Sequence, residues 1–262
     1  MRIVKSLAER CLDLVTLMSE DAKPLPLGEI SRRLDAPKSA THRLLTILCD
    51  RGWAAQEADG FYGLSLQLAV IGQRVLVGTG IPDICQPILD RLAHATEGLG
   101  RIAVVGPDGL TWIAQSQGAR TGLIYQPPLV AQVPLHITAN GKAWLATLDR
   151  QDALARAVAS GLGQPEQGGP HAITTKQTFS AALDETQERG WAAAIEEAEH
   201  GVAAVAAVIR VRGEVVGTVS VAGPVHRFSP LVVPELGDRV VAAAGELSAL
   251  WPYRIATPSV SV

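Results

Sequence analysis

The sequence is poor in cysteine, in aromatic residues and in excess charge, and it has no long uninterrupted apolar run. Its three cysteines are far apart in the chain, which argues against a disulfide framework or a zinc cluster and favours a reducing cytoplasm. The net charge of −3 gives no general attraction to nucleic acid or to anionic membranes. Because no window approaches the roughly 18 apolar residues of a membrane span, and charged residues interrupt the first apolar stretch, we expect neither a membrane helix nor a signal peptide.

What the sequence does contain suits two domains that each have a core. The chain has 262 residues, of which 47% are hydrophobic. Apolar spacing predicts helices over 4–20, 27–34 and 37–50, followed by strands at 53–57 and 61–65 that are joined across a glycine-containing turn. This order is typical of a winged helix-turn-helix. The predicted organisation is a winged helix-turn-helix DNA-binding domain at 1–65, a linker helix at 66–81 and a second domain at 82–262.

The second domain alternates helical and strand patterns in which hairpins outnumber βαβ units. This pattern predicts an antiparallel sheet and an α+β, sensor-like fold. The expected helices lie at 82–96, 140–148, 150–160, 178–189 and 231–250. The expected strands lie at 101–106, 110–116, near 122–126, and at 191–197, 202–211 and 214–223.

The stretch "APKSATHRLL" at 36–45 places polar residues at the start of a predicted helix and leucines after them. Pro37 suits the first helical position, and Ala36 offers no capping side chain, so the first amides are open to a phosphate oxygen. A recognition helix that enters the major groove by its N-terminal end has this layout. A solvated helix start is the alternative interpretation. The residues predicted to contact DNA are Pro37, Lys38, Ser39, Thr41, His42 and Arg43.

The local charge argues for more than one DNA-binding domain in the functional particle. Residues 1–75 contain ten Lys and Arg against nine Asp and Glu, a net charge of about +1. A single such domain binds a phosphate backbone weakly. We therefore expect a homodimer or homotetramer, with the linker helix paired through its apolar stripe.

The segment 27–72, "LGEISRRLDAPKSATHRLLTILCDRGWAAQEADGFYGLSLQLAVIG", resembles the DNA-binding segment of the IclR-type bacterial transcriptional regulators. In the second domain "PLHITANGKAWLATL", "GWAAAIEEAEHGVAAVAAVI" and "GEVVGTVSVAGP" are similar to other motifs of that family, in the same order. The resemblance implies a GAF-like effector-binding domain with a pocket built against its sheet. Thr138 is a plausible N-cap there, and the amides near Ala139, Asn140 and Gly141 would hold an acceptor group. Without the resemblance this segment would be interpreted simply as a capped helix.

The chain departs from the family at positions that the resemblance places around the ligand. Some members that sense small polar acids carry an aspartate, a cysteine and two serines, where this chain has Ala194, Ala204, Ser220 and Ala222. Methyl groups cannot satisfy a small acid, since unpaired buried polar atoms cost about 1–3 kcal/mol each. We expect a larger, partly apolar or aromatic ligand with one polar end near Asn140 and Ser220. The candidate walls are Trp112, Tyr125, Leu123 and Leu135.

Other chemistry has little support in the sequence. The histidines lack metal-ligand spacing, the charged run Glu196–His200 fits an edge between two strands, and no nucleophile elbow, P-loop or dinucleotide fingerprint occurs. We expect no catalytic residue, metal or cofactor, and a cytoplasmic ligand-responsive transcriptional regulator whose partners are double-stranded operator DNA, a small-molecule effector and further copies of the chain. Two alternatives stay open: a sensor-fold enzyme whose N-terminal helices serve only dimerisation, and an architectural DNA binder without sensing.

Overall fold

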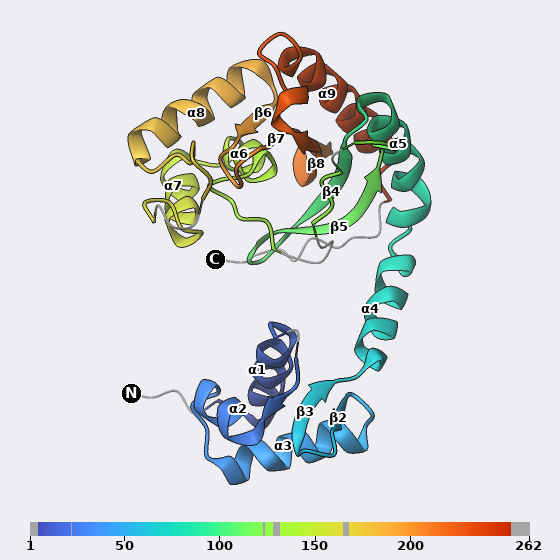
Figure 1. Ribbon diagram of the computed structural model, residues 1–262, viewed down its shortest axis with the longest axis vertical. Coiled ribbons are helices and arrows are strands. Elements are labelled where there is room, and N and C mark those ends of the chain that lie inside the picture. The colour runs from blue at the N-terminus through green and yellow to red at the C-terminus, as the bar shows by residue number, and fades with distance from the viewer. Residues whose placement is uncertain (1–4, 22, 123, 128–131, 165–167, 253–262) are drawn as a thin grey trace. The chain divides into compact units, whose positions relative to one another are not determined.

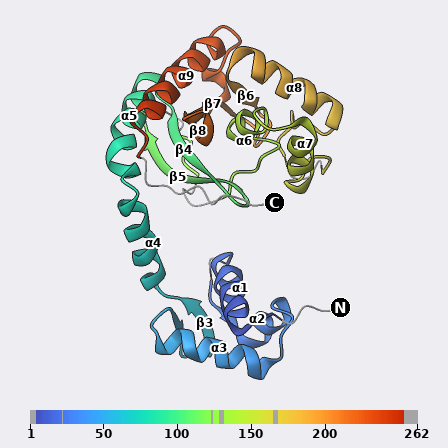
Figure 2. The same ribbon diagram turned by 180° about the vertical axis from the view of Figure 1, so that it is seen from behind.

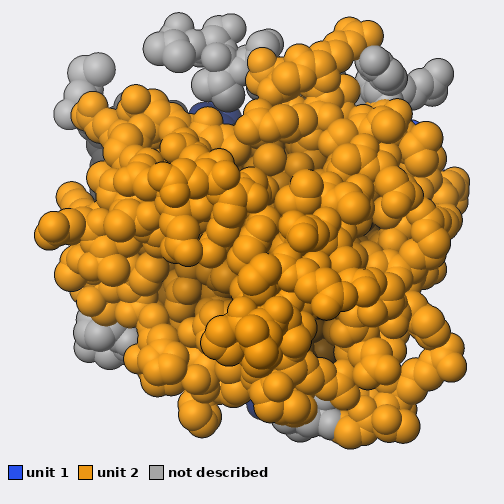
Figure 3. All heavy atoms as spheres, turned by 90° about the horizontal axis from the view of Figure 1, so that it is seen from above, with its two compact units in different colours: residues 1–78 blue, residues 79–262 orange. Residues whose placement is uncertain are grey.

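The computed structural model describes residues 5–21, 23–122, 124–127, 132–164 and 168–252. The chain divides into two compact units, Met1–Gly78 and Thr79–Val262, which Figure 3 distinguishes by colour. Each unit has its own hydrophobic core.

In unit 1, three helices and a small antiparallel sheet precede the last helix (Figure 1). A capping box of Ser6 and Glu9 begins the first helix. Side chains from all three helices meet in one core around Leu14, Ile30 and Leu45. The sheet has the order β1-β3-β2, and its first strand, two residues long, was not predicted. The elements are α1 (Leu7–Ser19), β1 (Leu25–Pro26), α2 (Leu27–Arg33), α3 (Lys38–Asp50), β2 (Ala54–Gln56) and β3 (Phe61–Leu64).

These elements confirm the predicted winged helix-turn-helix. The wing turns at Gly60, whose φ of +86° is a conformation that favours glycine. Asp35, with φ +49°, makes the tight connection between α2 and α3. The predicted position of Pro37 was wrong by one residue: its extended ψ of 141° makes it the N-cap, and α3 begins at Lys38.

Helix α4 (Leu66–Gly78) is the last element of unit 1, and none of its residues is buried against the part of the chain that the structure describes. Leu66 is 84% exposed and Val75 65%. Among the described residues no single helix has both the length and the hydropathy to cross a membrane. Helices α4 and α5 (Ile81–Thr96) reach that length and hydropathy only when they are counted as one segment, and the chain bends by 80° between the two helices.

Unit 2 is built on a five-stranded sheet with the order β5-β4-β8-β7-β6. Every neighbouring pair is antiparallel, as predicted. The expected strand near 122–126 is wrong, since Gly122 and residues 124–126 are irregular. The strands are β4 (Leu99–Gly106), β5 (Gly109–Gln117), β6 (Ala192–Ile195), β7 (Val202–Val211) and β8 (Glu214–Pro224).

Helices cover both faces of this sheet (Figure 2). On one face lie α5 and α9 (Val233–Leu250); on the other lie α6 (Ala139–Leu145), α7 (Arg150–Ala159) and α8 (Lys176–Arg189). The alternation of β7 explains this arrangement, because successive side chains point to opposite faces. Val205 and Ile209 join the core with α5 and α9, whereas Ala204 and Ala206 face α6. Small side chains on the α6 face leave room between the sheet and the start of that helix.

Candidate functional site

The first candidate site is the exposed side of α3. Leu44, Leu45 and Leu48 are buried in the core of unit 1. The polar residues of α3 that precede these leucines are either exposed or buried, and the exposed ones are Lys38, Ser39, His42 and Arg43. Pro37, which precedes them, is also exposed.

Thr41 does not belong to this exposed set, so its prediction as a DNA contact is corrected. Its side chain is fully buried, and its hydroxyl donates to the Pro37 carbonyl at 3.2 Å. It lies three and four residues before Leu44 and Leu45, and these spacings place it on the core face of the helix.

The start of α3 carries two further features suited to an anion. No side chain of the described residues caps this helix, so its first amides point outward at the positive end of the helix dipole. The Lys38 side chain runs back over the start of α2, where its Nζ is 3.9 Å from the position that a Cβ on Gly28 would take. The positive charge of Lys38 therefore lies beside the start of α2.

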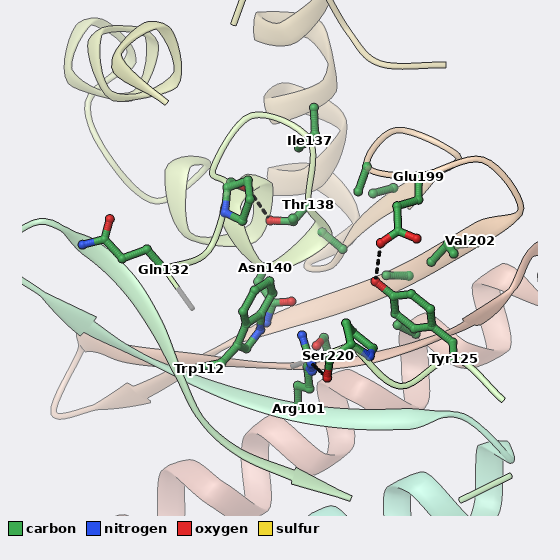
Figure 4. Close-up of a pocket in the computed structure, with 18 residues that line it drawn as sticks. Arg101, Trp112, Tyr125, Gln132, Ile137, Thr138, Asn140, Glu199, Val202 and Ser220 are labelled. Carbon is green, nitrogen blue, oxygen red and sulfur yellow. Dashed lines mark hydrogen bonds between the residues drawn. The ribbon is translucent and has the colours of Figure 1, made fainter. Parts of the chain in front are cut away.

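The second candidate site is a cavity of about 430 Å³ between the sheet of unit 2 and the N-terminus of α6 (Figure 4). Most of the predicted ligand residues line it: Trp112, Tyr125, Ala139, Asn140, Ala194, Ala204, Ser220 and Ala222. The four positions that the family resemblance placed around the ligand are thus all in its wall.

Three predicted positions do not contribute to the described wall. Gly141 packs against the Leu135 backbone so closely that a Cβ would be 2.2 Å from the Leu135 oxygen, and its amide donates to the Thr138 hydroxyl at 3.1 Å. Leu135 is buried in the core beside α6. Leu123 lies outside the described residues. Thr138 is the N-cap, as predicted, and lines the cavity.

The cavity is more polar than the motif positions alone predicted. Arg101, Gln132 and Glu199 also line it, and sequence reasoning missed all three. Arg101 is only 4% exposed although it is charged. The available signal was its place as the one charged residue in the strand "LGRIAVVG".

Arg101 is held by contacts on several sides. Its Nη2 donates to the Pro127 carbonyl at 2.9 Å and to Oε1 of Gln115 at 3.4 Å. The guanidinium carbon lies 4.6 Å from the ring centroid of Trp112, a cation–π contact. Burial lowers the pKa of Arg101, but arginine stays charged in proteins.

A tyrosine and a glutamate meet at another part of the wall. The Tyr125 hydroxyl donates to Oε1 of Glu199 at 3.3 Å, and Figure 4 shows the two side chains pointing toward each other. Burial, and then the nearby Glu199 carboxylate, raise the pKa of Tyr125 to about 12. This hydroxyl therefore keeps its proton at neutral pH.

Asn140 is oriented from within the domain. Its Nδ2 donates to the Thr218 hydroxyl at 2.9 Å, and both residues are buried. This bond fixes the Asn140 amide against β8. The side chain is therefore already oriented at the N-terminus of α6, where it lines the cavity.

The charged run between β6 and β7 is a connection between two strands, as expected, but one of its members is buried. Glu197 forms an ion pair with Lys142 of α6, with Nζ 2.5 Å from Oε1. Burial lowers the pKa of Lys142 and raises that of Glu197. The pair fixes the connection that contributes Ala198 and Glu199 to the cavity. Among the described residues, no group of three or more His, Cys, Asp or Glu is placed to hold a metal ion.

Comparison with known proteins agrees with both halves of the molecule. Residues 7–58 match the IclR helix-turn-helix domain, and residues 73–249 match the domain described as bacterial transcriptional regulator IclR C-terminal. The chain is 28% identical over 247 residues to the transcriptional repressor IclR of Escherichia coli (strain K12), a match that covers 91% of this chain and 87% of that protein.

Two solved structures share the fold. An IclR family transcriptional regulator from Brucella abortus has a TM-score of 0.78 at 19% identity, covering 95% of this chain and 93% of that chain. An IclR homologue from Microbacterium hydrocarbonoxydans, solved in complex with 4-hydroxybenzoate, has a TM-score of 0.74 at 20% identity, covering 93% and 98%. Because both of its domains match the domain models of this family, the chain belongs to the IclR family of bacterial transcriptional regulators.

Proposed function

We propose that this IclR-family regulator reads double-stranded operator DNA with the exposed side of α3. The uncapped N-terminus of α3, whose first residue is Lys38, would take a backbone phosphate of the DNA. Ser39, His42 and Arg43 are exposed on the following turns and are the candidates for base and further phosphate contacts. Pro37 would pack against the DNA backbone where α3 enters the groove.

The cavity of unit 2 is the proposed effector site. The observation that carries this proposal is a cavity lined by alanines and by a few preorganised polar groups. Its size exceeds that of a two-carbon acid, and the alanine side chains offer no hydrogen bonds. These features support a partly apolar or aromatic effector, and the 4-hydroxybenzoate bound by the Microbacterium homologue is of that class.

We further propose that the regulator acts as a homodimer or homotetramer in the cytoplasm. Helix α4 exposes Leu66, Val70, Val75 and Val77, and none of its residues is buried against the described part of the chain. Pairing with the same helix of a second copy would cover this surface and bring two recognition helices onto one operator.

The effector would act by shifting an equilibrium between arrangements of the paired DNA-binding domains. Only Thr79 and Gly80 separate α4 from α5 in the chain. A ligand that binds one arrangement more tightly changes the DNA affinity by at most the ratio of the ligand's affinities for the two arrangements.

Thermal unfolding of the full chain with small aromatic and aliphatic compounds tests this function. A ligand at about 100 times its dissociation constant raises the stability by about 2.7 kcal/mol. We expect shifts from aromatic compounds, little effect from glyoxylate or pyruvate, and recovery of the bound compound unchanged. Shifts from the small acids alone would reject the proposed ligand class, and turnover would favour an enzyme.

A further inference from the structure

We propose that the effector is a carboxylate and that Arg101 binds its acid group, with the apolar body of the ligand against the alanine wall. This inference rests on the proposed effector site and specifies which ligands that site accepts.

The position of Arg101 in the sheet places its charge in the floor of the cavity. Its strand β4 lies between β5 and β8, and the residue across the ladder on β8 is Ser220. Both residues line the cavity, and Figure 4 shows them side by side. A carboxylate at this point meets a cation and a hydroxyl donor together.

The guanidinium is preorganised for such a ligand. The bonds from Nη2 to Pro127 and Gln115 and the stacking on Trp112 fix its plane. A planar guanidinium matches the two oxygens of a carboxylate, and each charge-assisted bond is stronger where water is excluded. Arg101 therefore loses little freedom when an acid binds.

The remaining walls exclude a small acid as the best ligand. Ala194, Ala204 and Ala222 present methyl groups on the sheet, and Ile137 and Val202 add apolar surface. A two-carbon acid on Arg101 would leave most of the 430 Å³ unfilled. An aromatic ring attached to the carboxylate fills this space and covers the methyl groups.

The test is calorimetric titration of the full chain with benzoate, benzamide and methyl benzoate, which share a ring and differ in charge. We expect wild-type protein to bind benzoate at least about tenfold more tightly than either neutral compound, the effect of losing one hydrogen bond to a charged group. Arg101→Gln should abolish this preference while it retains benzamide binding, and Arg101→Lys should retain part of it.

Arg156→Gln is the matched control. Arg156 also stacks on a tryptophan, with its guanidinium carbon 5.3 Å from the ring centroid of Trp144, but it is not among the described residues that line the cavity. This variant should keep the full preference for benzoate.

Equal binding of benzoate and benzamide by the wild type would overturn the role of Arg101 and leave the aromatic effector site standing. The same holds for an Arg101→Gln protein that still prefers benzoate. If wild-type protein bound none of the three compounds at millimolar concentration, both the inference and the aromatic effector would be rejected. Should Arg101→Gln fail to fold, the wild-type comparison decides alone.

Discussion

Lys142 and Glu197 form an ion pair inside unit 2, with Nζ 2.5 Å from Oε1 and side chains only 4% and 10% exposed. Lys142 belongs to α6, the helix whose first residues line the cavity, and Glu197 belongs to the connection between β6 and β7. The pair joins two parts of the proposed effector site that are far apart in sequence.

Removing one partner of this pair should strongly lower the free energy of unfolding. Lys142→Met leaves the Glu197 carboxylate buried without its cation, and we expect a loss of about 3–5 kcal/mol in the free energy of unfolding. Urea denaturation measures it. The double variant Lys142→Met, Glu197→Leu should recover much of that loss, because it leaves no buried charge at this position. A double variant as unstable as the single one would show that packing, rather than charge, sets the cost.

Gly141 should not accept a side chain. A Cβ there would be 2.2 Å from the Leu135 carbonyl oxygen, so Gly141→Ala must displace backbone at the start of α6. We expect a loss of at least about 1–3 kcal/mol in the free energy of unfolding, as for other overpacked sites. Gly245→Ala in α9 is the control, since a Cβ there meets nothing within 4 Å among the described atoms, and it should stabilise by up to about 1 kcal/mol. Similar effects of the two substitutions would contradict the close approach.

His136 should make the stability depend on pH. Burial lowers its pKa in the folded state, so unfolding takes up a proton when the pH lies between the folded and unfolded pKa values. The free energy of unfolding should therefore be fully retained above the unfolded pKa of about 6.5, and should fall as the pH drops through that value toward the folded pKa. Urea titrations from pH 8 to pH 5 check this. His136→Gln should flatten the dependence in this window, and an unchanged slope would rule out His136 as its source.

The exposed and buried residues of α3 should respond differently to substitution. Arg43→Ala combined with Lys38→Ala should weaken operator binding and reduce the dependence of log K on log salt by about 0.9 for each phosphate that is no longer neutralised. Thr41→Val should lower stability by about 1 kcal/mol, since its hydroxyl bonds the Pro37 carbonyl, and should leave the salt slope unchanged. Fluorescence anisotropy with an operator selected from random DNA measures both variants. A loss of DNA affinity confined to Thr41→Val would reverse the assignment of the two faces.

The local patterns of the sequence were sufficient for the fold. The leucine spacing in α3 and the alternation along β7 each specify a buried face. The helices, the wing and the antiparallel sheet were predicted within a few residues of their observed bounds, except that β1 was missed and the strand expected near 122–126 does not form. The same spacing could also have predicted that Thr41 is buried, because Thr41 lies on the helical face of Leu44, Leu45 and Leu48. It was instead predicted to contact DNA because its side chain is polar.

The polar residues of the proposed effector site could not be predicted from local sequence patterns. Arg101 lines the cavity because three strands and an irregular segment meet there, and Glu197 is buried because a lysine 55 positions away in the chain pairs with it. Arg101 is visible in the sequence as the one charged residue of its strand, but its place in the cavity and the burial of Glu197 both depend on how distant segments pack. The motif positions Ala194, Ala204, Ser220 and Ala222 were found only because the family resemblance aligned them.

The central question is whether a ligand in unit 2 changes DNA binding by unit 1. The dissociation constant for the selected operator should be measured by anisotropy with and without saturating benzoate, whose own binding is measured by calorimetry with and without operator. We predict a change of about fivefold or more in the DNA constant, with an equal reciprocal change in the benzoate constant. Benzoate that binds the protein and leaves the operator affinity unaltered would contradict the proposed coupling between effector and DNA.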